Sequence, residues 1–273
     1  MLTRGVIHRV RARRSSSSRW LGAPRRAGQA ARRAHEAGAF IGIAHPAWSQ
    51  LTIQDGRDID CAHAVEIYNH GCAIENDRGE GFYLLDQLLN EGKRLTAFAT
   101  DDAHFKTPDH FGGWVHVKAE SLDPDALLSA LKAGHYYSSQ GPQLLDIELV
   151  GKELAVATSP VDTITVVCGN SRNCIRNGRA ITEAGFNLKD LERGWLLKRT
   201  SPWFRVVAID QAGNRSVVAA TTSILVSLSA PAAPVITFAR MASAHDLIFE
   251  RRSDTHIRAL ALALPRKRNF VVS

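Results

Sequence analysis

Asp102 and His104 are the residues of this chain whose types and spacing most directly indicate metal chemistry. They close the apolar run of residues 95–104 and stand two positions apart. Side chains at positions i and i+2 of a strand point to the same face, so a carboxylate oxygen and an imidazole nitrogen can converge on one cation. A divalent cation activates a bound water molecule for hydrolysis. A single Asp-x-His pair is a common pattern, so the hypothesis depends on further ligands.

Two other apolar runs also end in polar residues. Residues 40–46 lead to His45, and residues 64–69 contain Glu66 and end at Asn69. Buried parallel strands are short, nearly continuous apolar segments, and in α/β proteins the functional residues collect at the carboxyl ends of such strands. We therefore expect three strands that each bring polar groups to the same edge of a parallel sheet.

The segments around these runs have the patterns of crossover helices. We expect helices over residues 26–37, 81–91 and 124–133, each followed by a glycine. The third is the most explicit, with Asp123 as N-cap, Pro124 at the first helical position and Gly134 after the last turn. Helices that alternate with apolar strands are typical of βα units with a parallel sheet.

Over residues 30–216 the chain resembles the later part of a PHP-domain (polymerase and histidinol phosphatase) metal-dependent phosphoesterase, of the carbaryl-hydrolase-like branch. The motifs that carry the resemblance are IAHP at 43–46, VEIYN at 65–69, ENDRGEG at 75–81, ATDDAH at 99–104 and GHYYSSQGP at 134–142. The resemblance implies an α/β fold: a partial PHP-type (β/α)7 barrel with the later βα units only, followed by a small all-β, sandwich-like domain.

The resemblance also implies a function and its residues. His45, Asp102 and His104 fall on the family's late metal ligands, and the cofactors would be divalent ions of zinc, manganese or iron. The reaction would be attack of metal-bound hydroxide on a small phosphoester or related ester. Glu66 lies on a matching segment but is not assigned as a ligand, because the family's bridging glutamate lies earlier. Arg78 would bind the anionic substrate; alternatively it is an ordinary loop arginine paired with a neighbouring glutamate.

The chain departs from the family at its amino end. Family members open with a His-x-His strand and add further ligands, and no counterpart precedes His45. We therefore expect an amino-terminally truncated site with impaired activity. The alternative is a non-catalytic remnant that acts through its β-sandwich or complements another chain. An incomplete barrel would expose a sheet edge, through which the chain could associate with itself.

The positive charge of the chain is confined to its ends. The formal net charge is +7. The first 33 residues hold ten arginines and no acidic side chain, whereas residues 34–238 hold 17 basic and 24 acidic side chains. We therefore expect no folded basic patch and no nucleic acid as a partner. A transit peptide or a nucleic-acid-binding arm has a similar Arg-rich and Ser-rich composition, but we favour a disordered arm.

The remaining patterns concern the domain organisation. We expect the arm in residues 1–25, a partial PHP metal-dependent hydrolase domain in 26–141, a β-sandwich accessory domain in 142–220 and a poorly ordered tail in 221–273. Within the accessory domain, alternating or β-branched runs predict strands at 145–150, 163–168 and 203–209. The tail should contain one short helix or strand near 255–264.

The cysteines and the hydropathy bear on the compartment. The four cysteines lack Cys-x-x-Cys spacing, which argues against a structural zinc site, although Cys168 and Cys174 could pair across a hairpin. The chain contains no apolar run of the 18 residues that a transmembrane helix requires, so we expect no membrane partner. We expect a cytoplasmic protein with reduced thiols.

Overall fold

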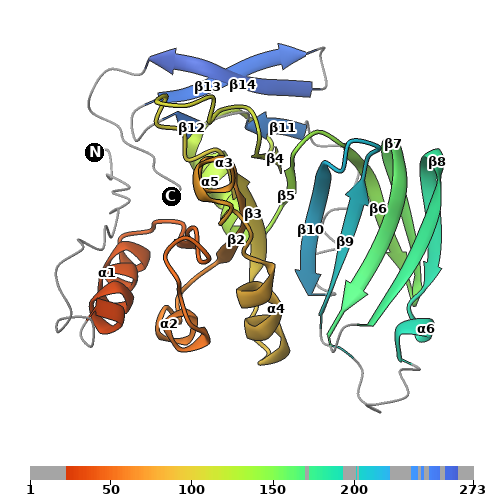
Figure 1. Ribbon diagram of the computed structural model, residues 1–273, viewed down its shortest axis with the longest axis horizontal. Coiled ribbons are helices and arrows are strands. Elements are labelled where there is room, and N and C mark those ends of the chain that lie inside the picture. The colour runs from red at the N-terminus through yellow and green to blue at the C-terminus, as the bar shows by residue number, and fades with distance from the viewer. Residues whose placement is uncertain are drawn as a thin grey trace.

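The computed structural model describes residues 23–169, 172–192, 201, 203–221, 235–238, 241–242, 246–252 and 256–263. A small parallel sheet and its helices lie beside a long curled sheet, and a further group of strands crosses one end of the molecule (Figure 1). Strands account for 42% of the structure and helices for 24%. Of the arm predicted for residues 1–25, residues 1–22 lie outside the described part of the chain.

The parallel sheet has three strands in the order β1-β2-β3. They are β1 (Gly42–Ile43), β2 (Ala64–Asn69) and β3 (Thr96–Thr100). These are the three apolar runs of the sequence, and every residue of β3 is buried. Because the strands are parallel, their carboxyl ends lie at one edge of the sheet, as the sequence predicts.

Helices flank this sheet, and local signals account for where several of them begin and end. They are α1 (Ala23–Glu36), α2 (Ile53–Asp58), α3 (His70–Asn76), α4 (Phe82–Asn90) and α5 (Pro124–Ala133), whereas the short α6 (Lys189–Glu192) lies beside the strand of residues 172–187 in the curled sheet. In α5 the side chain of Asp123 accepts a hydrogen bond from the amide of Asp125, and Gly134 ends the helix at φ 77°. A left-handed residue at this position favours glycine, which has no Cβ to clash. The helices predicted over residues 81–91 and 124–133 are thus present.

The larger sheet is mostly antiparallel. Its order is β12-β13-β14-β11-β4-β5-β10-β9-β7-β6, and β8 pairs with β7. The strands are β4 (Trp114–Lys118), β5 (Tyr136–Ser139), β6 (Leu144–Val150), β7 (Glu153–Cys168), β8 (Arg172–Asn187), β9 (Trp203–Ile209), β10 (Arg215–Thr221), β11 (Val235–Phe238), β12 (Met241–Ala242), β13 (Asp246–Arg252) and β14 (His256–Ala263). β14 falls where the sequence predicts one short element in the tail.

The prediction of a partial (β/α)7 barrel followed by a sandwich is wrong. Among the described residues after β3, no further parallel βα unit is present. Although α5 connects β4 to β5, these two strands pair antiparallel. β5 then pairs antiparallel with β10, so the strands expected in a separate sandwich continue the same sheet. The result is a curled antiparallel half-barrel with few helices.

The long strand β7 shows how this sheet curls. Its first half pairs with β6 and its second half with β9, while β8 follows both halves. The register shifts on either side of Val161, next to Pro160. Proline has no N–H to give to a ladder, and bulges increase the local twist of a strand. The bend at this point therefore turns the sheet around its own core.

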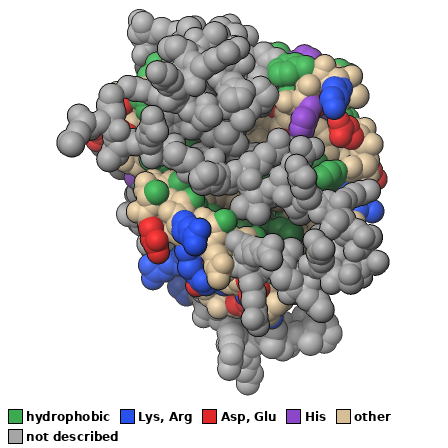
Figure 2. Space-filling view, turned by 90° about the vertical axis from the view of Figure 1, so that its left-hand side faces the viewer, with side chains coloured by type: hydrophobic (Ala, Val, Ile, Leu, Met, Phe, Trp, Pro, Cys, Tyr) green, Lys and Arg blue, Asp and Glu red, His purple; other side chains and the backbone are tan. Residues whose placement is uncertain are grey.

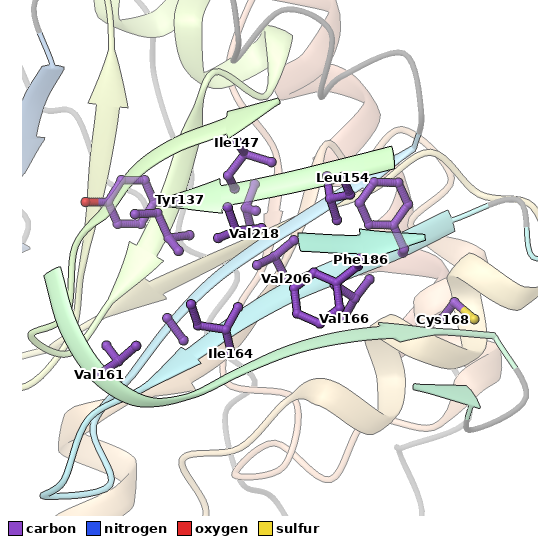
Figure 3. Packing of buried hydrophobic residues seen from close by; sticks show 14 of the residues in the cluster. Tyr137, Ile147, Leu154, Val161, Ile164, Val166, Cys168, Phe186, Val206 and Val218 are labelled. Atoms are coloured by element: carbon purple, nitrogen blue, oxygen red, sulfur yellow. The ribbon is translucent and has the colours of Figure 1, made fainter. Parts of the chain in front are cut away.

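Two hydrophobic clusters hold the two sheets. One lies inside the curled sheet, where residues such as Ile164, Val166 and Val206 are fully buried (Figure 3). The other joins the leucines of α4 and residues of the parallel sheet to Trp203, Val207, Val217 and Ala219 of β9 and β10. A fully buried aliphatic side chain contributes roughly 1.5 to 3 kcal/mol. The second cluster therefore fixes the parallel sheet, and the site at its edge, against the curled sheet.

Polar contacts reinforce the packing between α4 and β9. The guanidinium of Arg205 donates two hydrogen bonds to the carboxylate of Asp86, both of 3.2 Å, and lies 4.6 Å from the ring centre of Phe82. The indole of Trp203 donates to the side-chain oxygen of Asn90 at 3.1 Å. A paired arginine that also stacks on an aromatic ring orders both elements.

The described surface carries mixed charge. On the side of the molecule in Figure 2, basic and acidic side chains lie next to each other among the described residues. Exposed ion pairs such as Arg32 with Asp60 and Arg57 with Glu91 are part of this pattern. Among the described helices, none combines the length and the apolar character needed to cross a membrane.

Candidate functional site

The candidate site lies at the carboxyl ends of β1, β2 and β3. His45 follows β1 by two residues, Asn69 is the last residue of β2, and Asp102 follows β3 by two residues. In the register of the sheet Asn69 lies beside Thr100, the last residue of β3. The segments that the sequence identifies as separate motifs are therefore neighbours in space.

A hydrogen-bond network connects the three loops that follow these strands. The side-chain amide nitrogen of Asn69 lies 3.2 Å from Oε2 of Glu66 and 3.3 Å from Oδ2 of Asp102. The backbone N–H of His45 donates to the same Oε2 of Glu66 at 2.5 Å. The other oxygen of Glu66 accepts the hydroxyl of Thr100 at 2.5 Å. Two carboxylates and an amide thus join the ends of all three strands.

Glu66 is a buried carboxyl group, with 1% of its surface exposed. Burial raises its pKa to about 7, against the opposing effect of hydrogen bonds from Thr100, His45 and Asn69. A charged group taken out of water is stabilised only by such donors. Because its two oxygens accept three hydrogen bonds from the protein, Glu66 supports the surrounding loops and is not open to a ligand.

Two of the predicted ligands have strained backbones. His45 has φ 33° and Asp102 has φ 49°. Non-glycine residues rarely adopt positive φ, and such residues cluster at active sites and ligand-binding loops, where the surrounding structure must hold them. The network around Glu66 and Asn69 supplies that support at both positions.

The loop after β3 is organised by two other aspartates. The carboxylate of Asp101 accepts the backbone N–H groups of Phe111, Gly112 and Gly113 at 2.6 to 2.8 Å. The carboxylate of Asp109 accepts the N–H of His104 at 2.6 Å. Both aspartates are almost completely buried. They close the loop that carries Asp102 and His104, and charge-assisted hydrogen bonds of this kind are the stronger ones in proteins.

In the structure, the side chains of the three predicted metal ligands, His45, Asp102 and His104, do not converge on one position. The side chain of His104 is exposed, and the ring of His45 lies 2.7 Å from the hydroxyl of Ser49 through Nδ1. Among the described residues, no group of three or more His, Cys, Asp or Glu side chains is arranged to hold a metal ion. The donor types suit a divalent cation, although the described side chains do not form such a group as they lie. We therefore derive no catalytic step through a metal.

Arg78, the predicted substrate-binding residue, lies on the loop between α3 and α4. This loop packs along β2: the N–H of Asn69 donates to the carbonyl of Gly79 at 2.9 Å, and the N–H of Gly81 donates to the carbonyl of Ile67 at 3.1 Å. A Cβ on Gly81 would lie 1.9 Å from the carbonyl oxygen of Glu66, so only glycine allows this approach.

The alternative that Arg78 pairs with a neighbouring glutamate is not what the structure shows. Its side chain is exposed and forms no ion pair among the described residues, whereas Glu80 pairs with Arg215 at 3.4 Å. An exposed guanidinium near the carboxyl end of β2 is available to an anion, and arginine binds carboxylate and phosphate groups with two parallel hydrogen bonds.

Asn69, Asp101 and Asp109 are the residues of the site that sequence reasoning does not single out. Asn69 carries a partial signal, because it ends an apolar run and asparagine is a favoured N-cap. The sequence gives a weaker signal for Asp101 and Asp109. In the pair Asp101-Asp102 the first turns into the loop and the second toward Asn69, and no sequence rule distinguishes these directions.

Comparisons of this chain with protein-family models, with curated proteins and with solved structures find no match. The candidate site therefore depends on its own geometry and on the resemblance described above.

Proposed function

We propose that this chain is a metal-dependent hydrolase of the PHP phosphoesterase type, with its site at the carboxyl ends of β1, β2 and β3. The observation that carries the proposal is the network of His45, Glu66, Asn69 and Asp102, which joins the ends of three parallel strands. In α/β proteins this edge of a sheet is where ligands bind. Zinc, manganese and iron are the cofactors that the resemblance implies.

The residues of the chain have different parts in this proposal. Asp102 is the central ligand, because its side chain is tied to the network through Asn69. His45, on the loop after β1, and His104, on the same loop as Asp102, are the nitrogen donors. Arg78 binds the anionic group of a phosphoester substrate. Since the three ligands do not converge as they lie, we expect low activity.

Metal content tests this proposal directly. The purified wild-type chain should retain zinc, manganese or iron in elemental analysis, and His45→Ala should lower the retained amount. His135→Ala is a matched control, because His135 lies in the turn before β5, outside the network. A wild-type chain free of these metals, together with a His45→Ala variant that behaves like wild type, would contradict the proposal.

One observation favours a second candidate, a non-catalytic module. The oxygens of Glu66 and one oxygen of Asp102 accept hydrogen bonds from protein groups, so the network is complete without an ion. A buried polar network that is fully satisfied is stable and specific by itself. The two candidates differ in one result: only the hydrolase loses metal when His45 is replaced.

A further inference from the structure

We infer that Asn69 is a positioning residue that holds Asp102 in its strained conformation and couples the loops after β1, β2 and β3 into one unit. The importance of Asp102 to a ligand depends on the proposed function, whereas the positioning itself depends only on the contacts of Asn69. Asn69 ends the VEIYN motif of residues 65–69, but the three predicted ligands do not include it.

The orientation of the Asn69 side chain is fixed from two sides. Its Oδ1 accepts the backbone N–H of Cys72 at 2.8 Å, which makes Asn69 the N-cap of α3. Its own backbone N–H donates to Gly79. Only 1% of its surface is exposed, so the side chain has no room to turn away. With the oxygen committed to the cap, the amide NH2 group must point in the opposite direction.

The NH2 group meets two carboxylates in that direction. An amide nitrogen has two hydrogens, and the distances of 3.2 Å to Glu66 and 3.3 Å to Asp102 use one for each. Two carboxylates close together repel each other, and a donor shared between them offsets the repulsion. The amide group of Asn69 therefore lies between the two carboxylates and donates to both.

Glu66 provides the fixed end of this arrangement. It lies within a buried strand and accepts two further hydrogen bonds, from His45 and Thr100. Asp102, by contrast, lies on a loop, is partly exposed and has φ 49°. The hydrogen bond from Asn69 is the contact that ties its side chain to the sheet.

The variant Asn69→Ser separates positioning from helix capping. Serine remains a good N-cap, so α3 is retained, but both donors to the carboxylates are lost. Asp123→Ser is a matched control, because it makes the same kind of exchange at the N-cap of α5, far from the site. If Asn69→Ser does not fold, Asn69→Asp keeps the cap and the size of the side chain and also removes the donors.

Two measurements on the full chain decide the inference. In a metal-free crystal structure of Asn69→Ser, or of Asn69→Asp, the side chain of Asp102 should leave its position beside Glu66. In a titration with Mn²⁺ alone, Asn69→Ser should bind about tenfold more weakly than wild type, as is typical when a group that orients a ligand is removed, and Asp123→Ser should bind as wild type does.

The outcomes distinguish this inference from the proposed function. If Asp102 keeps its position in the variant structure, Asn69 does not position it and the inference is overturned. If wild type binds no Mn²⁺, the proposed function fails, while a displaced Asp102 still supports the inference. If wild type binds Mn²⁺ and Asn69→Ser binds it equally well with Asp102 in place, the inference alone fails.

Discussion

Glu66, Asn69 and Asp102 show how individual residues make the candidate site. A buried carboxylate is costly unless protein groups donate hydrogen bonds to it, and Glu66 receives three such bonds from residues on three different segments. Those same bonds determine the positions of His45 and Asp102. The buried Glu66 thus supports the loops, whereas Asp102 is partly exposed.

The sequence predicts part of this arrangement. The position of Asp102 after a buried strand and its proximity to the end of β2 follow from the apolar runs. The role of Asn69 does not follow, because it depends on the direction of one amide group between two carboxylates. The sequence also does not predict where the side chain of His104 lies. The loop that carries His104 is held by the carboxylates of Asp101 and Asp109, which accept hydrogen bonds from backbone N–H groups.

His63 makes the stability of the protein depend on pH. Burial, together with the charges of His35 and Lys132, lowers the pKa of His63 from 6.5 to about 4 in the folded protein. Between these values the unfolded chain binds a proton that the folded chain does not. The free energy of unfolding should therefore fall as the pH is lowered from 6.5 toward 4.

The variant His63→Asn checks this dependence. Asparagine can accept the backbone N–H of Ile41 as Nδ1 of His63 does, but it does not titrate. Urea unfolding at pH 5 and at pH 7.5 should show a smaller difference for the variant than for wild type. The measurement at pH 7.5 is the internal control, because His63 is neutral there in both states. Equal differences in the two proteins would argue against His63 as the source.

At the scale of elements, the sequence predicts where helices and strands lie better than how they pair. The capping residues Asp123 and Gly134 define α5, and the apolar runs define β1 to β3. The sequence does not predict the direction in which β4 and β5 pair, because the periodicity along one strand contains no information about its neighbour. A helix between two strands is typical of a parallel crossover, yet β4 and β5 pair antiparallel and begin the curled sheet.

The packing of helix α4 joins the parallel sheet, which carries the site, to β9 and β10 of the curled sheet. Leu88 is fully buried between the parallel sheet and β9 and β10, so Leu88→Ala should lower the free energy of unfolding by about 2 to 5 kcal/mol. Tyr83 lies on the same helix with 73% of its surface exposed, and Tyr83→Ala should change it by less than about 0.5 kcal/mol. Urea denaturation measures both variants, and similar losses would contradict the packing described for α4.

At the scale of the whole molecule, one continuous sheet crosses the boundary that the sequence places after residue 141. β5 on one side pairs with β10 on the other, and the cluster around α4 includes residues from both sides. The alternating and β-branched runs after residue 141 do form strands, but these strands continue a sheet and a core that begin before that residue. Sequence periodicity cannot show that two such regions share their buried surface.

This continuity predicts cooperative unfolding. Far-ultraviolet circular dichroism follows the strands and helices, and tryptophan fluorescence follows the five tryptophans, among them Trp203 of β9, which is buried against α4. The two signals should give the same urea midpoint, since regions that share a core lose it together. Two separated transitions, one for each side of residue 141, would show that the regions fold independently.

The measurement that tests the central claim most directly is hydrolysis of p-nitrophenyl phosphate by the full chain, with and without added Mn²⁺, for wild type and Asp102→Asn. Asparagine keeps the shape of the side chain but lacks the charge that binds a cation. The account predicts slow hydrolysis by wild type that requires Mn²⁺ and falls at least about tenfold in Asp102→Asn, the loss expected when a metal ligand or its support is removed. Hydrolysis that is absent with every metal tested, or that is equal in the two proteins, would contradict it.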